Sequence, residues 1–393
     1  MKTKTKQVAL PHGEQFLRRA VRIAAYYGFS PAEETVRLGK NFSPRGIDLK
    51  SLESELRLTL GIPAGVALAS YFARSERQPM MFYHVTSNAT ALSFGLDIVG
   101  VPQSMAEALL IKTALVILEE FGLGGMRVHI NSVGDRDSLN RFTRELQLYL
   151  RKHIEELPAR GRELMKRDVL ASLTYLAQKS PEVYEGAPKP MEFLSEASRR
   201  HLREMLEYLE TAEIPYEVNN SLIPANNMYS QTIFEIRRPN FPEEGGEELL
   251  AEEETLARGG RYDEVLRRAG RSGISAVRLL MGAPCRNKME VVMPRPSQKP
   301  KVYFIQLGLD ARIRSLGILD LLRKAHVSLT QSIGTDTLAG QLSTAERLSV
   351  PYAIIMGQKE ALEKTVIVRN LSSRRQDTVP IAVLPIYIKQ IGL

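Results

Sequence analysis

Two short segments combine glycine with polar and charged side chains, and these residue types are suited to ligand binding or chemistry. Residues 257–263 read ARGGRYD, and residues 130–135 read INSVGD. On a structural interpretation, Gly259 and Gly260 form a turn, because glycine adopts backbone angles that other residues avoid, and Tyr262 packs beside it. On a functional interpretation, the same polar side chains belong to a binding pocket.

Histidine and cysteine do not form a recognisable metal site in this sequence. Cys285 is the only cysteine, and the six histidines are scattered without the spacing of zinc ligands. An internal disulfide is excluded, so a reducing cytoplasm is the expected location. No apolar run approaches the roughly 18 residues needed to span a bilayer, and no secretion signal follows the first lysines. We therefore expect a cytoplasmic protein without membrane contact, metal or cofactor.

Positive charge is concentrated towards the C-terminus. The chain carries a formal net charge of +8, and residues 299–393 contain 13 Lys and Arg against 7 Asp and Glu. This excess favours polyanions, and we expect RNA to bind here because cations contact phosphates. For any single cation a solvated surface role is the plainer interpretation, so only the cluster is informative. The RNA-binding candidates are Arg312, Arg314, Arg323, Lys324, Arg347, Arg374 and Arg375.

Length and composition predict a folded protein with two or three domains. A chain of 393 residues exceeds one compact core, and its 44% apolar and 25% charged residues are typical of globular proteins. Prolines at residues 294–300 predict an exposed linker. Residues 1–293 then form a core domain, with an inserted subdomain at about 153–205, and residues 301–393 form a second domain.

Hydrophobic periodicity predicts the elements that position these residues. A helix is expected over residues 13–27, ended by Gly28, and a hairpin over residues 80–85 and 92–99. Ser104 followed by Glu107 has the spacing of a capping box at the start of another helix. A strand at residues 126–130 and a helix at 137–152 follow. Beyond the linker, strands and helices alternate as in an α/β layer structure.

The order of several motifs resembles the histidyl-tRNA synthetase family. Besides the two glycine-containing segments, residues 94–100 (FGLDIVG) resemble the strand that closes the family's second class II motif. Residues 229–236 (YSQTIFEI) resemble its YTGxVFEI-like strand, and residues 350–357 (VPYAIIMG) resemble the core of its anticodon-binding domain. The motifs occur in family order, and the similarity covers nearly the whole chain.

This resemblance implies an α+β fold and a set of site positions. The expected architecture is a class II synthetase-like antiparallel sheet of six or more strands flanked by helices, with a C-terminal α/β anticodon-binding-like domain, usually in a homodimer. Asp97, Tyr229 and Tyr262 fall where the family holds its amino acid and are interpreted as a vestigial pocket. The other remnants of family motifs are Gly259, Gly260, Arg261 and Asp263.

Several arginines that the resemblance implies are missing. Amino-acid activation joins a carboxylate to the α-phosphate of ATP, so fixed cations must stabilise its transition state. Residues 86–92 are shorter than the family's loop and contain no arginine, and Pro224 and Cys285 stand at two family arginine positions, with Arg286 one place away. Arg278 occupies a position where glycine is usual, and residues 58–65 lack the LRPEGT-like segment. We therefore predict a pseudoenzyme with no catalytic residues.

Three functions remain open from the sequence. The favoured one is a non-catalytic synthetase-like protein that binds tRNA or another structured RNA in translation or its regulation. The second is a protein-binding regulator similar to the regulatory subunit of ATP phosphoribosyltransferase in histidine biosynthesis. The third is a divergent active histidine-tRNA ligase in which Arg286 or other residues replace the missing cations.

Overall fold

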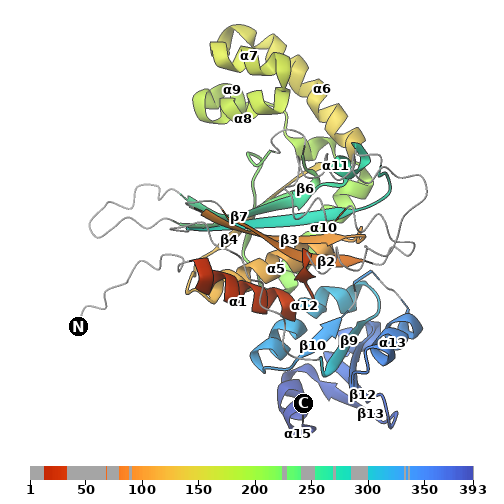
Figure 1. Cartoon of the computed structure of the whole chain (residues 1–393). Coiled ribbons are helices and arrows are strands. Elements are labelled where there is room, and N and C mark those ends of the chain that lie inside the picture. The colour runs from red at the N-terminus through yellow and green to blue at the C-terminus, as the bar shows by residue number, and fades with distance from the viewer. Residues whose placement is uncertain are drawn as a thin grey trace, which may run out of the picture.

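A computed structural model describes residues 13–32, 68, 79–87, 91–223, 228–239, 253–268, 271–284, 300–331, 333–334 and 337–392. Within these ranges the chain forms two sheets and the helices around them (Figure 1). The first sheet contains β1 (Ser30–Pro31), β2 (Met80–Ser87), β3 (Ala91–Val99), β4 (Arg127–Gly134), β5 (Tyr216–Val218), β6 (Ser230–Pro239), β7 (Glu253–Arg261) and β8 (Ala276–Pro284). No helix in these ranges is long and apolar enough to cross a membrane.

The first sheet is antiparallel through its centre. Its strand order is β1-β2-β3-β8-β7-β6-β4-β5, and the pairs β1–β2 and β4–β5 at its two edges are parallel. One face is apolar, because side chains alternate along each strand and Phe94, Leu96 and Ile98 of β3 all point to that side. The helices α1 (Gly13–Tyr26), α5 (Met105–Glu119) and α10 (Glu196–Thr211) pack on this face. The predicted antiparallel sheet flanked by helices is confirmed.

The start of α5 differs from its sequence prediction. α5 begins at Met105 after Ser104, but the Ser104 side chain makes no capping hydrogen bond. Its Oγ instead donates to Glu204 of α10 at 3.3 Å, and the Glu107 carboxylate accepts from Arg261. The predicted capping box is therefore wrong. A buried guanidinium from a distant strand offers this carboxylate a stronger, charge-assisted partner than the local backbone does.

A helical insertion follows β4 and projects from the sheet at the top of the view (Figure 1). It consists of α6 (Arg136–Lys152), η1 (Ile154–Glu156), α7 (Ala159–Arg167), α8 (Val169–Lys179), α9 (Pro181–Glu185) and η2 (Pro190–Phe193). Its buried side chains form their own apolar cluster between Phe142 and Ala187. By contrast, the buried side chains of α10, such as Met205, belong to the main core. The separate apolar cluster thus starts before residue 153 and ends before α10.

The C-terminal part is an α/β layer structure, as predicted. It contains β9 (Val302–Gln306), α12 (Leu309–Lys324), β10 (Leu329–Gln331), α13 (Leu338–Arg347), β11 (Tyr352–Met356), α14 (Gln358–Glu363), β12 (Thr365–Asn370), β13 (Gln376–Pro380), η4 (Ile381–Val383) and α15 (Leu384–Gln390). Its strand order is β10-β9-β11-β12-β13. α12 packs against α5 and α10, and Lys112 of α5 pairs with Asp320 of α12 at 3.4 Å. This domain therefore sits on the helical layer of the first sheet (Figure 1).

Most predicted elements are confirmed within these ranges. The first helix ends before Gly28, whose φ of +97° suits glycine, and β2 and β3 form the predicted hairpin with only residues 88–90 between them. Tyr303 lies in the core of the second domain. The short strands β10 and β13 and the helices α14 and α15 were not predicted. The linker, apart from Pro300, and residues 240–252 of the acidic loop lie outside the described residues.

Candidate functional site

The polar face of the first sheet carries the candidate site. Strand pairing places Asp97 of β3 opposite Arg278 of β8, and Gly260 of β7 opposite Arg278 on its other side. On β2, His84 lies opposite Gly95, next to Asp97 along β3. Because residues two apart share a face, the register gathers these side chains on the side opposite the apolar core. Four strands distant in sequence therefore supply one cluster.

Asp97 and Arg278 form a buried ion pair at the centre of this cluster. The Arg278 Nε lies 3.3 Å from Asp97 Oδ1, and Nη2 lies 3.3 Å from Oδ2. Asp97 also accepts the Tyr262 hydroxyl at 2.9 Å and lies 3.3 Å from His84 Nδ1. Asp97 and Tyr262 are 0% exposed and Arg278 is 1% exposed. The carboxylate is thus surrounded by partners from the chain itself.

Electrostatics favour the charged forms of this pair. Burial alone raises the pKa of Asp97, but the Arg278 guanidinium and His84 outweigh it and hold the pKa below its ordinary value. Burial likewise disfavours the Arg278 cation, and Asp97 overcomes this effect and raises the pKa of Arg278. The guanidinium also lies 5.5 Å from the centre of the Tyr262 ring. Asp97 therefore needs no further cation to neutralise it.

Neighbouring groups approach three glycines of these strands closely. A Cβ on Gly95 would lie 2.1 Å from the His84 ring, and one on Gly260 would lie 2.8 Å from the Tyr229 ring. A Cβ on Gly259 would lie 2.3 Å from the Arg278 carbonyl oxygen. The predicted turn at Gly259 and Gly260 is wrong, since both residues lie within β7 and neither has a positive φ. They are small because neighbouring backbone and aromatic rings approach closely.

A shallow pocket remains beside the filled cluster. It has a volume of about 200 Å³ and is lined by residues of β3, β7 and β8, including Ser93, Arg258 and Gly282. Arg258 is exposed and lies 3.7 Å from Glu235, which also pairs with Arg237 at 2.6 Å. Glu235 therefore pairs with two basic neighbours. Among the described residues, no group of three His, Cys, Asp or Glu side chains could hold a metal ion.

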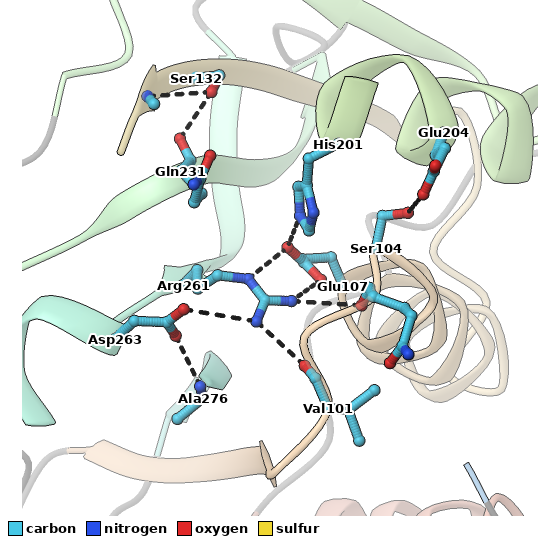
Figure 2. A network of polar contacts seen from close by, with 12 residues as sticks. Val101, Ser104, Glu107, Ser132, His201, Glu204, Gln231, Arg261, Asp263 and Ala276 are labelled. Atoms are coloured by element: carbon cyan, nitrogen blue, oxygen red, sulfur yellow. Dashed lines mark hydrogen bonds and ion pairs between the residues drawn. The ribbon is translucent and has the colours of Figure 1, made fainter. Parts of the chain in front are cut away.

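Arg261 and Asp263 belong to a second, structural network (Figure 2). Arg261 is 1% exposed, and its Nη2 and Nε donate to the two oxygens of Glu107 at 2.6 and 2.9 Å. His201 of α10 lies 2.6 Å from the same carboxylate, and Asp263 lies 3.8 Å from Arg261 and accepts the Ala276 amide at 2.7 Å. This network ties β7 to α5, α10 and β8. Burial raises the pKa of Glu107, but Arg261 and His201 more than offset it and bring the pKa to about 2.

The INSVGD segment at residues 130–135 also has structural contacts. Asp135 caps α6, because its Oδ1 accepts the Ser138 amide at 2.9 Å. The Ser195 hydroxyl donates to Asp135 Oδ2 at 2.5 Å and so joins the start of α10 to the start of α6. Asn131 donates to the Leu222 carbonyl at 2.9 Å. The motif thus holds the insertion and α10 against β4.

The structure brings the three predicted pocket residues, Asp97, Tyr229 and Tyr262, into one cluster. Its central member, Arg278, had been noted only as a bulky residue at a glycine position. His84 and His201 were missed, because nothing in their local sequence distinguishes them from core or surface residues, and Glu107 was predicted only as part of a capping box. Several positions used to predict a pseudoenzyme lie outside the described residues: residues 58–65, 88–90 and 224–227, Cys285 and Arg286.

The seven RNA-binding candidates occupy different environments. Arg312 and Arg314 are partly buried near the start of α12. Arg323 and Lys324 both lie 3.0 Å from Asp320, at the contact with the first domain. Arg347, Arg374 and Arg375 are exposed. Lys324 is exposed as well, but among the exposed candidates only Arg347, Arg374 and Arg375 form no ion pair within the described residues.

Comparisons with known proteins identify one matching family model and several similar proteins. Residues 306–391 match the family model described as an anticodon binding domain. The chain is 30% identical over 294 residues to the histidine–tRNA ligase of Corynebacterium jeikeium, covering 73% of this chain and 63% of that protein. It is 24% identical over 410 residues to the corresponding ligase of Dehalococcoides mccartyi, covering 97% and 96%. The crystal structure of apo histidyl-tRNA synthetase from S. aureus has a TM-score of 0.47 and 18% identity, covering 99% of this chain and 100% of that one.

Proposed function

Because this chain belongs to the histidyl-tRNA synthetase family, we propose that it binds tRNA or another structured RNA and does not activate an amino acid. The observation that carries the non-catalytic half is the position of Arg278. Its guanidinium lies against Asp97 and Tyr262, two of the residues that the family resemblance assigns to the amino-acid pocket. This contact supports a pocket in which the chain's own cation takes the place of a substrate amine.

The energetics support this proposal. An amine-bearing substrate could reach Asp97 only after Arg278 had left, and the guanidinium would then need another carboxylate or water. Breaking a buried ion pair by removing one partner typically costs about 3–5 kcal/mol. The His84 ring over Gly95 and the Tyr229 ring over Gly260 would also have to move. Substrate binding would have to compensate for all of these changes.

The RNA-binding half rests on the C-terminal domain. Its match to an anticodon binding domain covers residues 306–391, and residues 299–393 hold 13 Lys and Arg against 7 Asp and Glu. The domain is anchored to the first domain through Lys112 and Asp320, and through a hydrogen bond from the Tyr26 hydroxyl to the Leu319 carbonyl at 3.3 Å. A domain that resembles an anticodon-binding domain and is anchored on the helical layer, together with a filled pocket on the other face of the sheet, supports RNA binding without catalysis.

Two measurements on the full chain test the two halves. Histidine-dependent exchange of pyrophosphate into ATP should stay at background, and a robust signal would favour a divergent ligase. Filter binding of total tRNA at two salt concentrations should give an affinity that falls steeply with salt, as counterion release requires. Absent or salt-insensitive binding would instead favour a protein-binding regulator similar to the regulatory subunit of ATP phosphoribosyltransferase.

A further inference from the structure

One edge of the C-terminal sheet gathers the ends of several strands. The first residues of β9, β10 and β11 lie side by side, since Val302 pairs with both Leu329 and Tyr352. β12 runs antiparallel to β11, so its last residue, Asn370, lies opposite Tyr352. The hairpin between β12 and β13 is attached to this edge by a hydrogen bond from the Leu371 amide to the Pro351 carbonyl at 2.9 Å. Residues before β9, before β11 and between β12 and β13 thus meet at one edge.

This edge carries four exposed cations. Lys301 precedes β9, Arg347 ends α13 just before β11, and Arg374 and Arg375 lie in the hairpin. Within the described part of the chain, none of the four side chains forms an ion pair, in contrast to Arg323 and Lys324 nearby. We define Lys301, Arg347, Arg374 and Arg375 as the basic edge.

Acidic groups near the basic edge are few among the described residues. Glu346 is the exposed neighbour of Arg347. Asp377 of β13 accepts the Tyr387 hydroxyl at 2.6 Å, so its carboxylate is turned to α15. The loops at the edge also present exposed hydroxyls, from Ser349, Ser372 and Ser373. Cations and hydroxyl donors together form a surface suited to phosphate oxygens.

The opposite edge of the same sheet is different. There, β11 ends at Met356 and α14 follows, with Lys359 3.9 Å from Glu363. The Glu360 carboxylate turns back and accepts a hydrogen bond from the Gly357 amide at 2.9 Å. Lys364 follows directly after this acidic helix. Positive and negative charges therefore alternate at that edge, whereas the basic edge has mainly one sign.

We propose that the basic edge is the surface that binds the sugar–phosphate backbone of RNA, an inference that rests on the proposed function. When exposed cations neutralise phosphates, the counterions condensed on the RNA are released, and this release drives association. Tyr352, the aromatic side chain nearest the edge, is partly buried, so it offers little area for base stacking. Recognition at this edge is therefore through phosphate positions, with weak dependence on base identity.

Two triple variants of the full chain test this surface. The first, Arg347→Gln, Arg374→Gln and Arg375→Gln, removes three of the four positive charges of the basic edge. The matched control, Lys359→Gln, Lys364→Gln and Lys389→Gln, removes the same charge from exposed positions elsewhere in the domain. Thermal melting of both variants checks that folding is preserved. The probe is total tRNA, measured by filter binding over a salt series, with poly-L-glutamate as a second labelled polyanion.

The basic-edge variant should bind tRNA at least about tenfold more weakly, and the slope of log affinity against log salt should fall by about 2 to 3. The control should retain most of the wild-type affinity and slope. Equal losses in both variants would overturn the basic edge while leaving RNA binding in place. Absence of tRNA binding by the wild type would overturn the proposed function itself. Equal affinity for poly-L-glutamate would replace RNA with an acidic protein partner.

Discussion

The Arg278 guanidinium and the Asp97 carboxylate are paired through two contacts of 3.3 Å in the interior of the first sheet. The pair joins β3 to β8, and the side chains of His84 and Tyr262 contact the Asp97 carboxylate. Because neither partner is exposed to water, the loss of either one leaves an uncompensated charge in a low-dielectric environment. The stability of the fold and the binding of a cation next to Asp97 therefore depend on the same carboxylate.

Replacing Arg278 should destabilise the protein strongly. Arg278→Ala leaves the Asp97 carboxylate buried and unpaired, and the free energy of unfolding should fall by about 3–5 kcal/mol. The measurement is urea denaturation followed by circular dichroism. Arg267→Ala, which removes a surface ion pair with Glu264, is the matched control and should leave the midpoint unchanged. The double variant Asp97→Asn with Arg278→Met should recover part of the loss, and an additive loss in the double variant would contradict the coupling.

A small cation should replace the missing guanidinium. Arg278→Gly removes the side chain but keeps the Asp97 carboxylate, so methylguanidinium at low concentration should raise the melting temperature of this variant. Wild type and the double variant Asp97→Asn with Arg278→Gly should show no such rise. If methylguanidinium leaves the melting temperature of Arg278→Gly unchanged, the site collapses when Arg278 is removed and Asp97 does not stay accessible to a ligand.

Because Glu107 is buried and ionised, the free energy of unfolding should depend on pH. Its pKa is about 2 in the folded protein, against an ordinary value of 4.5. A lowered folded pKa contributes stability above the unfolded value, and this contribution, about 3 kcal/mol here, is lost as the pH falls from about 5 to about 2. Glu107→Gln should therefore be much less stable than wild type at pH 7, and the difference should narrow towards pH 3. A constant difference between the two proteins across this range would rule out the assignment.

Local patterns predicted the elements well, because helix and strand periodicity depend on neighbouring residues. The first helix, the hairpin of β2 and β3 and the alternation of the C-terminal domain all follow from such patterns. The pairing of Asp97 with Arg278 could not be predicted in the same way, since the two residues are 181 positions apart and meet only through strand order. The capping box at Ser104 failed for the same reason, because the Arg261 guanidinium, 154 positions away, takes the Glu107 carboxylate. The sequence shows where these charged residues lie along the chain, but the pairing of Asp97 with Arg278 becomes visible only from the register of the sheet.

Two glycines should respond in opposite ways to alanine. Gly95→Ala would place its Cβ 2.1 Å from the buried His84 ring, so the ring must leave Asp97, and the free energy of unfolding should fall by about 1–3 kcal/mol. Gly317 lies exposed within α12, and no atom lies within 4 Å of an added Cβ. Gly317→Ala should therefore stabilise the protein by about 0.5–1 kcal/mol, because alanine favours the helix. Urea denaturation of both variants measures whether the free energy of unfolding falls or rises in each. If Gly95→Ala leaves the free energy of unfolding unchanged, the His84 ring can move aside. The polar face would then have room for a ligand next to Asp97.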